Sequence, residues 1–303
     1  MNSRSAGSFV TLGALVAVLS LMPALAQSQQ KKGTAPAVKG APSAARPTPR
    51  LPDGHPDLGN DKGSWDPTII DDIAGTGGGD PGNIDIQIAN RKKGYGLGGP
   101  RLVDKEVNVP FLPWAKKVYD DRERTLSKDD PEALCLPPGI PRMMATPFPF
   151  QIYQLPNRLI FVYEGGAHMW HIVYMDGRKH SADAMEYPTY LGESIGHWQG
   201  DTLVVDNIGF NDKTWLDAAG HPHTEKLHVI EHFTRPNEAT LHYEATIDDP
   251  GAYSKPWTTS WNIKWTPGIT PLEYICQEAN ADVAHLVGNV TPNERETGDT
   301  KRK

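Results

Sequence analysis

The sequence predicts a mainly β protein: an antiparallel meander of about nine strands that closes into a barrel-like body, with one short helix before it. Two observations support this fold class. From Phe150 onward, short apolar or alternating segments follow one another with almost no helical periodicity between them. Tight-turn sequences such as Asp176-Gly177 separate these segments. Closing a meander removes exposed strand edges, so we favour a barrel over a sandwich.

The expected strands alternate apolar and polar residues and end at turn residues. They cover 150–156, 158–164, 168–175, 195–198, 202–208, 226–234, 240–248, 257–265 and 272–277. One helix is expected over 113–127, because Pro113 suits a first turn and Trp114, Val118, Tyr119 and Leu126 recur at helical spacing.

The chain divides into five parts. Residues 1–26 have the basic start, apolar run and small-residue end of a signal peptide, so the protein is expected to be exported, to the periplasm or beyond. Residues 27–50 are rich in Pro, Ala and Lys and predict a disordered tether. Residues 51–149 predict an irregular Gly/Pro-rich segment, with the helix, packing on a barrel over 150–288. Residues 289–303 predict a disordered tail.

The charge and hydropathy of the chain limit the classes of partner that it is expected to bind. The first 50 residues contain six basic and no acidic side chains, and the remainder carries 24 basic against 37 acidic ones, a net charge of −13. So acidic a body argues against nucleic acid, whose affinity comes from basic contacts to phosphate. After the signal peptide no apolar run reaches the length of a membrane span. The oligomeric state is not indicated. A small molecule is therefore the expected partner.

The chain contains two cysteines, Cys135 and Cys276. In an oxidising compartment an even pair predicts a disulfide, and the alternative is two separate buried thiols. Neither cysteine has a Cys or His neighbour at the spacing of a zinc site.

Seven blocks of sequence resemble a family of exported bacterial proteins. They are PDGHPDL, CLPPGIPR, YMDGR, SIGHWQGDTLVVDNIGF, WLDAAGHPHTEKLHVIEHFTR, TIDDPGAYSKPW and LEYICQE, in order over residues 51–288. The resemblance implies export and brings no reaction or catalytic residues with it. The chain departs from the family pattern in a longer, glycine-rich segment after PDGHPDL and in Glu193, where a histidine is common. Gly196-His197-Trp198 is also similar to the Gly-x-Trp of lipocalins, which favours a calycin-like barrel that holds a ligand.

Glu231 is the first candidate for chemistry. In the strand 226–234 it shares a face with Leu227, Val229 and Phe233, so it is expected to point into the barrel. A buried carboxylate must be paired or its pKa rises. A salt bridge to Arg142, Arg158 or Arg178 is one interpretation. A catalytic acid or base and a metal ligand are the others.

The segment 220–225 is the second candidate. If it is extended, His223 and Glu225 share a face, and a histidine from 168–175, His168 or His171, could complete a site for a divalent metal such as zinc. A solvated, hydrogen-bonded histidine loop is the alternative interpretation. We take Glu231, His223 and Asp217 as candidate catalytic residues, and His223, Glu225 and His171 as candidate metal ligands. The candidate ligand-binding residues are Trp215, His168, Arg178 and Tyr163.

Two main functions fit these features. One is an enzyme that acts on a small molecule by hydrolysis or isomerisation, with or without a metal. The other is a lipocalin-like binding protein in which the polar groups are only structural. A structural or interaction role in the cell envelope is a third.

Overall fold

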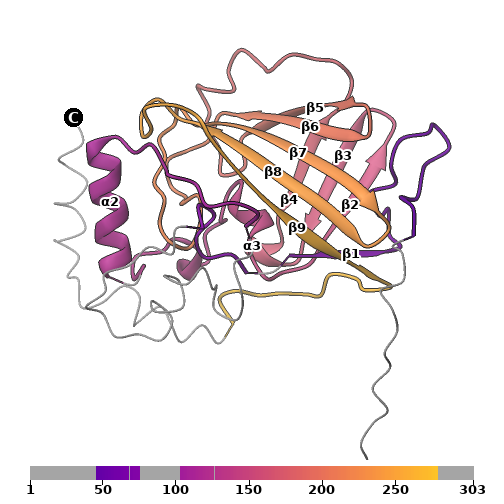
Figure 1. The fold of residues 1–303 in the computed structure, drawn as a ribbon, viewed down its shortest axis with the longest axis horizontal. Coiled ribbons are helices and arrows are strands. Elements are labelled where there is room, and N and C mark those ends of the chain that lie inside the picture. The colour runs from indigo at the N-terminus through magenta and orange to yellow at the C-terminus, as the bar shows by residue number, and fades with distance from the viewer. Residues whose placement is uncertain (1–45, 68, 76–102, 126, 279–303) are drawn as a thin grey trace, which may run out of the picture. The chain divides into compact units, whose positions relative to one another are not determined.

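The computed structural model describes residues 46–67, 69–75, 103–125 and 127–278. The predicted signal peptide, most of the predicted tether and the predicted tail lie outside these residues. Nine strands form a closed barrel in sequence order, which confirms the predicted fold class (Figure 1). The strands are β1 Gly63–Asp66, β2 Phe150–Leu155, β3 Arg158–Tyr163, β4 Trp170–Tyr174, β5 Glu193–Gln199, β6 Thr202–Ile208, β7 His228–Asn237, β8 Thr240–Asp248 and β9 Trp257–Pro267.

The burial of the long strands follows the period of two that the sequence predicts. In β7, Val229, Glu231 and Phe233 are buried and the residues between them are partly exposed. In β9, Trp257, Trp261 and Trp265 lie on one buried face with Thr259 and Ile263. Large aromatic side chains therefore fill much of the barrel interior. A polar residue at an inward position must find hydrogen-bond partners inside the barrel.

Three features of the barrel differ from the prediction. The predicted last strand, 272–277, is not a strand, and the set of nine is completed instead by β1 near the start of the chain. Strand β1 pairs with both β2 and β9 and so closes the barrel. The pairing of β4 with β5 is parallel, because residues 175–192 cross back along the barrel before β5 begins. Residues 46–50 also contact the barrel: Thr48 Oγ1 donates to the Arg235 carbonyl at 2.6 Å, and Arg50 pairs with Asp201.

The predicted helix is α2, Pro113–Arg124, with a different buried face from the expected one. Ala115, Tyr119 and Glu123 are buried, at a spacing of four, whereas Trp114 is 42% exposed. The indole N–H of Trp114 donates to the Gly251 carbonyl at 2.8 Å. Within the described ranges, the other helical elements are α3, Gly165–His168, and the 3-10 turns Glu132–Leu134 and Arg142–Met144.

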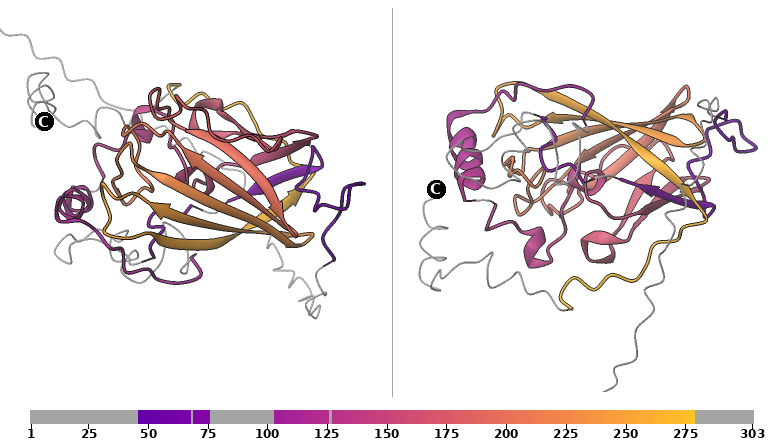
Figure 2. Two further views of the ribbon diagram at one scale, coloured as in Figure 1. Left: turned by 90° about the horizontal axis from the view of Figure 1, so that it is seen from above. Right: turned by 60° about the horizontal axis from the view of Figure 1, so that its bottom comes forward.

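The two ends of the barrel are different. At one end the strands are joined by tight turns such as 156–157 and 200–201. At the other end, where β6 ends and β7 begins, lie α3 and the long connections 209–227 and 249–256. We call this the loop end. Figures 1 and 2 show α2 standing beyond it. The topology thus brings the two long connections together at the end of the barrel where α2 lies, and loops of this kind often carry functional residues.

The predicted disulfide between Cys135 and Cys276 is formed, with 2.06 Å between the sulfurs. It connects the 3-10 turn after Asp130 to the segment that follows β9. Among the described residues no helix is long and apolar enough to cross a membrane.

Candidate functional site

The loop 211–225, between β6 and β7, carries a cluster of buried polar side chains at the loop end. Asn211, Thr214, Asp217, His221 and His223 are each less than a tenth exposed. Buried polar groups must be hydrogen-bonded or they destabilise the fold. The partners of these side chains therefore define what the loop can do.

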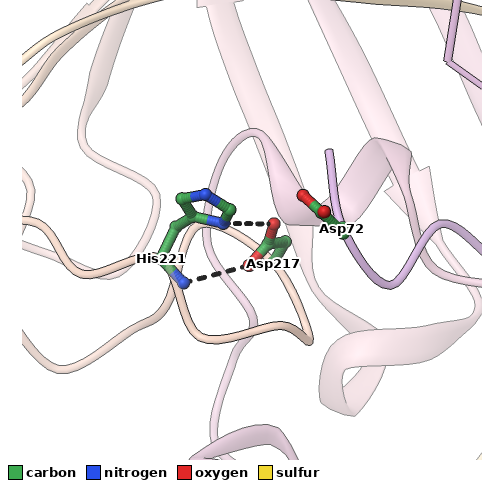
Figure 3. Close-up of side chains that lie close together, drawn as sticks. All are labelled: Asp72, Asp217 and His221. Atoms are coloured by element: carbon green, nitrogen blue, oxygen red, sulfur yellow. Dashed lines mark hydrogen bonds and ion pairs between the residues drawn. The ribbon is translucent and has the colours of Figure 1, made fainter. Parts of the chain in front are cut away.

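Asp217 and His221 form a completely buried pair, in which Oδ2 lies 2.7 Å from Nδ1 (Figure 3). The carboxylate accepts three further bonds, from the backbone N–H groups of Ile73 at 3.0 Å, Gly220 at 2.9 Å and His221 at 3.1 Å. All four lone-pair sites of Asp217 are thus used. Despite burial, the imidazole and these N–H groups hold the pKa of Asp217 below its usual value, and its charge raises the pKa of His221.

The ring of His221 lies among aromatic side chains. It stacks on Phe111 at 5.4 Å between centroids and packs against Tyr119 at 4.4 Å and Trp257 at 5.6 Å. The second ring nitrogen, Nε2, has no hydrogen-bond partner among the described residues, and neither does the indole N–H of Trp257. Asp217 therefore fixes the orientation of His221, and in the described part of the chain Nε2 is surrounded by aromatic rings and has no hydrogen-bond partner.

Asp72 completes a group of three buried residues that could hold a metal ion. One ligand atom from each of Asp72, Asp217 and His221 lies within 4.8 Å of the others, and Figure 3 shows the Asp217 carboxylate between the other two side chains. Carboxylate oxygen and imidazole nitrogen are suitable zinc or manganese ligands. An ion here would have to displace one of the four bonds to Asp217.

His223 is held differently, by both of its ring nitrogens. Nδ1 lies 3.2 Å from the carbonyl oxygen of Thr224, which can only accept, so Nδ1 carries the proton. Nε2 is 2.7 Å from Oγ1 of Thr214 and accepts from that hydroxyl. Burial lowers the pKa of His223, which favours the neutral ring with Nε2 unprotonated. The arrangement is a hydroxyl, a base and a group that orients the base.

A pocket opens beside this pair. Its volume is about 300 Å³, and it is lined by Trp114, Val118, Arg122, Asp212, Thr214, Pro222, His223 and Thr224. Arg122 is fixed in place, because its guanidinium lies 4.1 Å from the ring centroid of Trp215 and donates to the Gly220 carbonyl at 3.0 Å. The pocket combines an apolar wall from α2 with polar groups from the loop, as small-molecule sites do.

Glu231 points into the barrel as predicted, but it forms no salt bridge with any residue that the structure describes. Tyr243 donates to Oε1 at 2.8 Å and the amide of Asn207 donates to Oε2 at 3.0 Å. Because burial outweighs these two neutral donors, the pKa of Glu231 rises to about 7. The network continues from Asn207 to Ser194 and from Ser194 to His171, whose pKa burial lowers to about 4.

The arginines proposed as partners of Glu231 lie elsewhere. Arg142 is buried and binds both oxygens of Asp130, at 2.7 and 2.6 Å, and also Glu132. Arg158 contacts Asn157. Arg178, also a candidate for ligand binding, is exposed and pairs with Asp176 over the ring of Tyr174.

The structure separates the other predicted site residues into different environments. The candidate catalytic residues Glu231, His223 and Asp217 belong to three distinct hydrogen-bond networks. The candidate metal ligands do not share a face: His223 is buried, Glu225 is exposed because the segment before β7 is not a strand, and His171 lies in the barrel. Tyr163 is buried near Glu231, and Trp215 lies under Arg122. The side chain of His168 is outside the described part.

Sequence reasoning missed four residues of the site: Thr214, His221, Asp72 and Arg122. His221 was visible beside His223 in the sequence, but the assumed strand parity selected His223 and Glu225 instead. Thr214, Asp72 and Arg122 come from a loop, an irregular segment and α2, and only the fold brings them to one end of the barrel.

The fold and this site define a closed β-barrel protein with a buried histidine cluster and a pocket at one end. No protein-family model matches the chain, and searches of curated proteins and of solved structures find no match either.

Proposed function

We propose that the protein is an enzyme that binds a small molecule in the pocket beside His223 and acts on it by acid–base chemistry. One observation carries the proposal: a neutral, buried histidine, held at both ring nitrogens, lines a pocket of about 300 Å³. A general base needs an unprotonated nitrogen within hydrogen-bond distance of the proton that it removes. Nε2 of His223 is 2.7 Å from Oγ1 of Thr214, a hydroxyl that carries a transferable proton.

The surroundings of the pocket support hydrolysis or isomerisation. Arg122 lines the pocket, and its positive charge would stabilise negative charge that develops on a substrate oxygen. Trp114 and Val118 supply an apolar surface for the rest of the molecule. The second histidine pair, Asp217 with His221, lies on the same loop and fixes its fold. Export, which the sequence predicts, would make the substrate an environmental or cell-envelope molecule.

The test is turnover of a small-molecule panel, covering esters, lactones and enolisable ketones, by the mature protein (residue 27 onward, without the predicted signal peptide) and by its His223→Gln variant. Removing a general base is expected to lower kcat/KM by about 100-fold or more. His197→Gln, on the exposed face of β5, is the matched control and should keep full activity. Equal activity in wild type and His223→Gln, with both folded, would refute the proposal.

A non-catalytic binding protein is the alternative that the same pocket supports. In that case a ligand found in the panel by a thermal shift would bind without conversion. The binding should then weaken on Val118→Asp, which places a charge on the apolar wall of the pocket.

Metal binding is the second candidate function, because Asp72, Asp217 and His221 bring three ligand atoms within 4.8 Å of one another. The test is the metal content of untagged protein prepared without chelator. Near-stoichiometric zinc or manganese, lost in Asp72→Asn and retained in His223→Gln, would support it. Metal-free protein that also fails to take up added zinc or manganese would refute it.

A further inference from the structure

We propose that Thr214 is the nucleophile of the site and that its substrates are therefore acyl compounds such as small esters or lactones. The inference rests on the proposed function, because it uses the same pocket and the same histidine. It goes further by naming the atom that attacks and the bond that breaks.

The geometry around Thr214 supports this role. Its hydroxyl donates to Nε2 of His223 at 2.7 Å, and Nδ1 of His223 is directed to the Thr224 carbonyl at 3.2 Å. The base therefore faces the Thr214 hydroxyl with its only lone pair. A nucleophile, a base and an orienting acceptor in this order is the arrangement that activates serine and threonine hydroxyls.

The hydroxyl is also held in position from its other side. An ideal Cβ built on Gly139 would lie 2.9 Å from Oγ1 and 3.1 Å from Cβ of Thr214. Only a residue without a side chain leaves room for Thr214 at this point. Thr214 is 5% exposed and is one of the residues that line the pocket.

The reaction balances without any further reagent except water. Nε2 of His223 takes the Thr214 proton as Oγ1 forms a bond to the substrate carbonyl carbon. The carbon–oxygen bond to the leaving alcohol then breaks, and the alcohol receives that proton. Water attacks the acyl-threonine, returns one proton through His223 to Oγ1, and releases the acid. Arg122, which also lines the pocket, would supply the positive charge that stabilises the oxyanion in both additions.

The experiment uses p-nitrophenyl acetate with the mature protein and acid quenching, followed by intact and peptide mass measurement. One acetyl group is expected on Thr214 in wild type and in Thr214→Ser, and none at that position in Thr214→Val. His223→Gln should acetylate position 214 at least about 100-fold more slowly. His197→Gln is the control for acetylation of exposed side chains and should match wild type.

The outcomes separate this inference from the proposed function. If Thr214→Val keeps wild-type turnover while His223→Gln loses it, Thr214 is not the nucleophile and His223 still acts as a base. If both variants keep turnover, both proposals fail. An acetyl group on Thr214 that never turns over, with Thr214→Ser equally inert, would also overturn the inference, because no catalytic cycle would be completed.

Discussion

Asp217 and His221 form the buried ion pair around which the loop end of the barrel is organised, with Oδ2 2.7 Å from Nδ1 and both residues completely buried. The same carboxylate accepts the N–H of Ile73, from a segment 144 residues away in sequence. One side chain thus joins the loop after β6 to the irregular segment after β1. The pocket beside His223 depends on that loop, so Asp217 supports the site without lining it.

Asp217→Asn is expected to destabilise the protein by about 3–5 kcal/mol, the cost of leaving one partner of a buried pair behind. The amide keeps the volume but turns one oxygen into a donor that faces existing donors. Urea unfolding measures the change. Glu225→Gln, an exposed carboxylate on the same loop, is the control and should alter the unfolding free energy by less than about 0.5 kcal/mol. A similar loss in both variants would contradict the role assigned to Asp217.

Gly139→Ala is expected to disturb the Thr214–His223 pair as well as the stability. Gly139 has φ +78°, and the added Cβ would lie 2.9 Å from Thr214 Oγ1. Gly177→Ala is a matched control, since Gly177 has φ +75° and nothing within 4 Å of the added carbon. Both variants should lose about 1–2 kcal/mol to backbone strain. Only Gly139→Ala should lose a further 1–3 kcal/mol, approximately, to overlap.

Nuclear magnetic resonance separates the backbone strain from the overlap with Thr214. The ring signals of His223 should shift in Gly139→Ala, because the hydroxyl that donates to Nε2 is displaced, and should stay unchanged in Gly177→Ala. Unchanged His223 signals in both variants would mean that the loop moves as a unit and that Gly139 does not set the position of Thr214.

The raised pKa of Glu231 predicts how the free energy of unfolding depends on pH. Its folded pKa is raised to about 7 from the ordinary value of 4.5, so the folded state binds its proton more tightly than the unfolded state does. Stability from this group is therefore complete below about pH 4.5 and is lost as pH rises to about 7. The loss amounts to about 3 kcal/mol across that interval. Unfolding free energies measured from pH 4.5 to 8 test the direction and the size.

The matched variant is Glu231→Gln, which removes the titration and keeps the shape. Tyr243 and Asn207 are neutral partners, so no opposite charge is left unpaired in this variant. The difference in stability between the variant and wild type should increase in favour of the variant from pH 4.5 to 7. A constant difference across that range would show that Glu231 does not titrate there.

The strands and the inward position of Glu231 could be predicted from sequence, because alternation with period two depends only on neighbouring residues. The partners of Glu231 could not, because Tyr243 and Asn207 face it from β8 and β6 through the register of the barrel. The strand β1 was missed because four residues between glycine- and proline-rich segments carry too little pattern. Likewise, no local pattern links Thr214 to Gly139, which are brought together only by the packing of two irregular segments.

Removing the disulfide between Cys135 and Cys276 is expected to reduce the order of the segment 269–276. Beyond β9, the contacts of the segment 269–276 include Leu272 N–H to Glu164 at 2.7 Å, the ring of Tyr274 on Phe148 at 4.7 Å and the disulfide itself. In the double variant Cys135→Ser with Cys276→Ser, the free energy of unfolding is expected to fall by about 2–5 kcal/mol. Chymotrypsin should also cut after Leu272 or Tyr274 much faster than in wild type, well before the barrel is digested, because local opening no longer strains a crosslink. Mass measurement of the first fragments identifies the cut. Equal cleavage rates in the two proteins would show that packing alone holds this segment on the barrel.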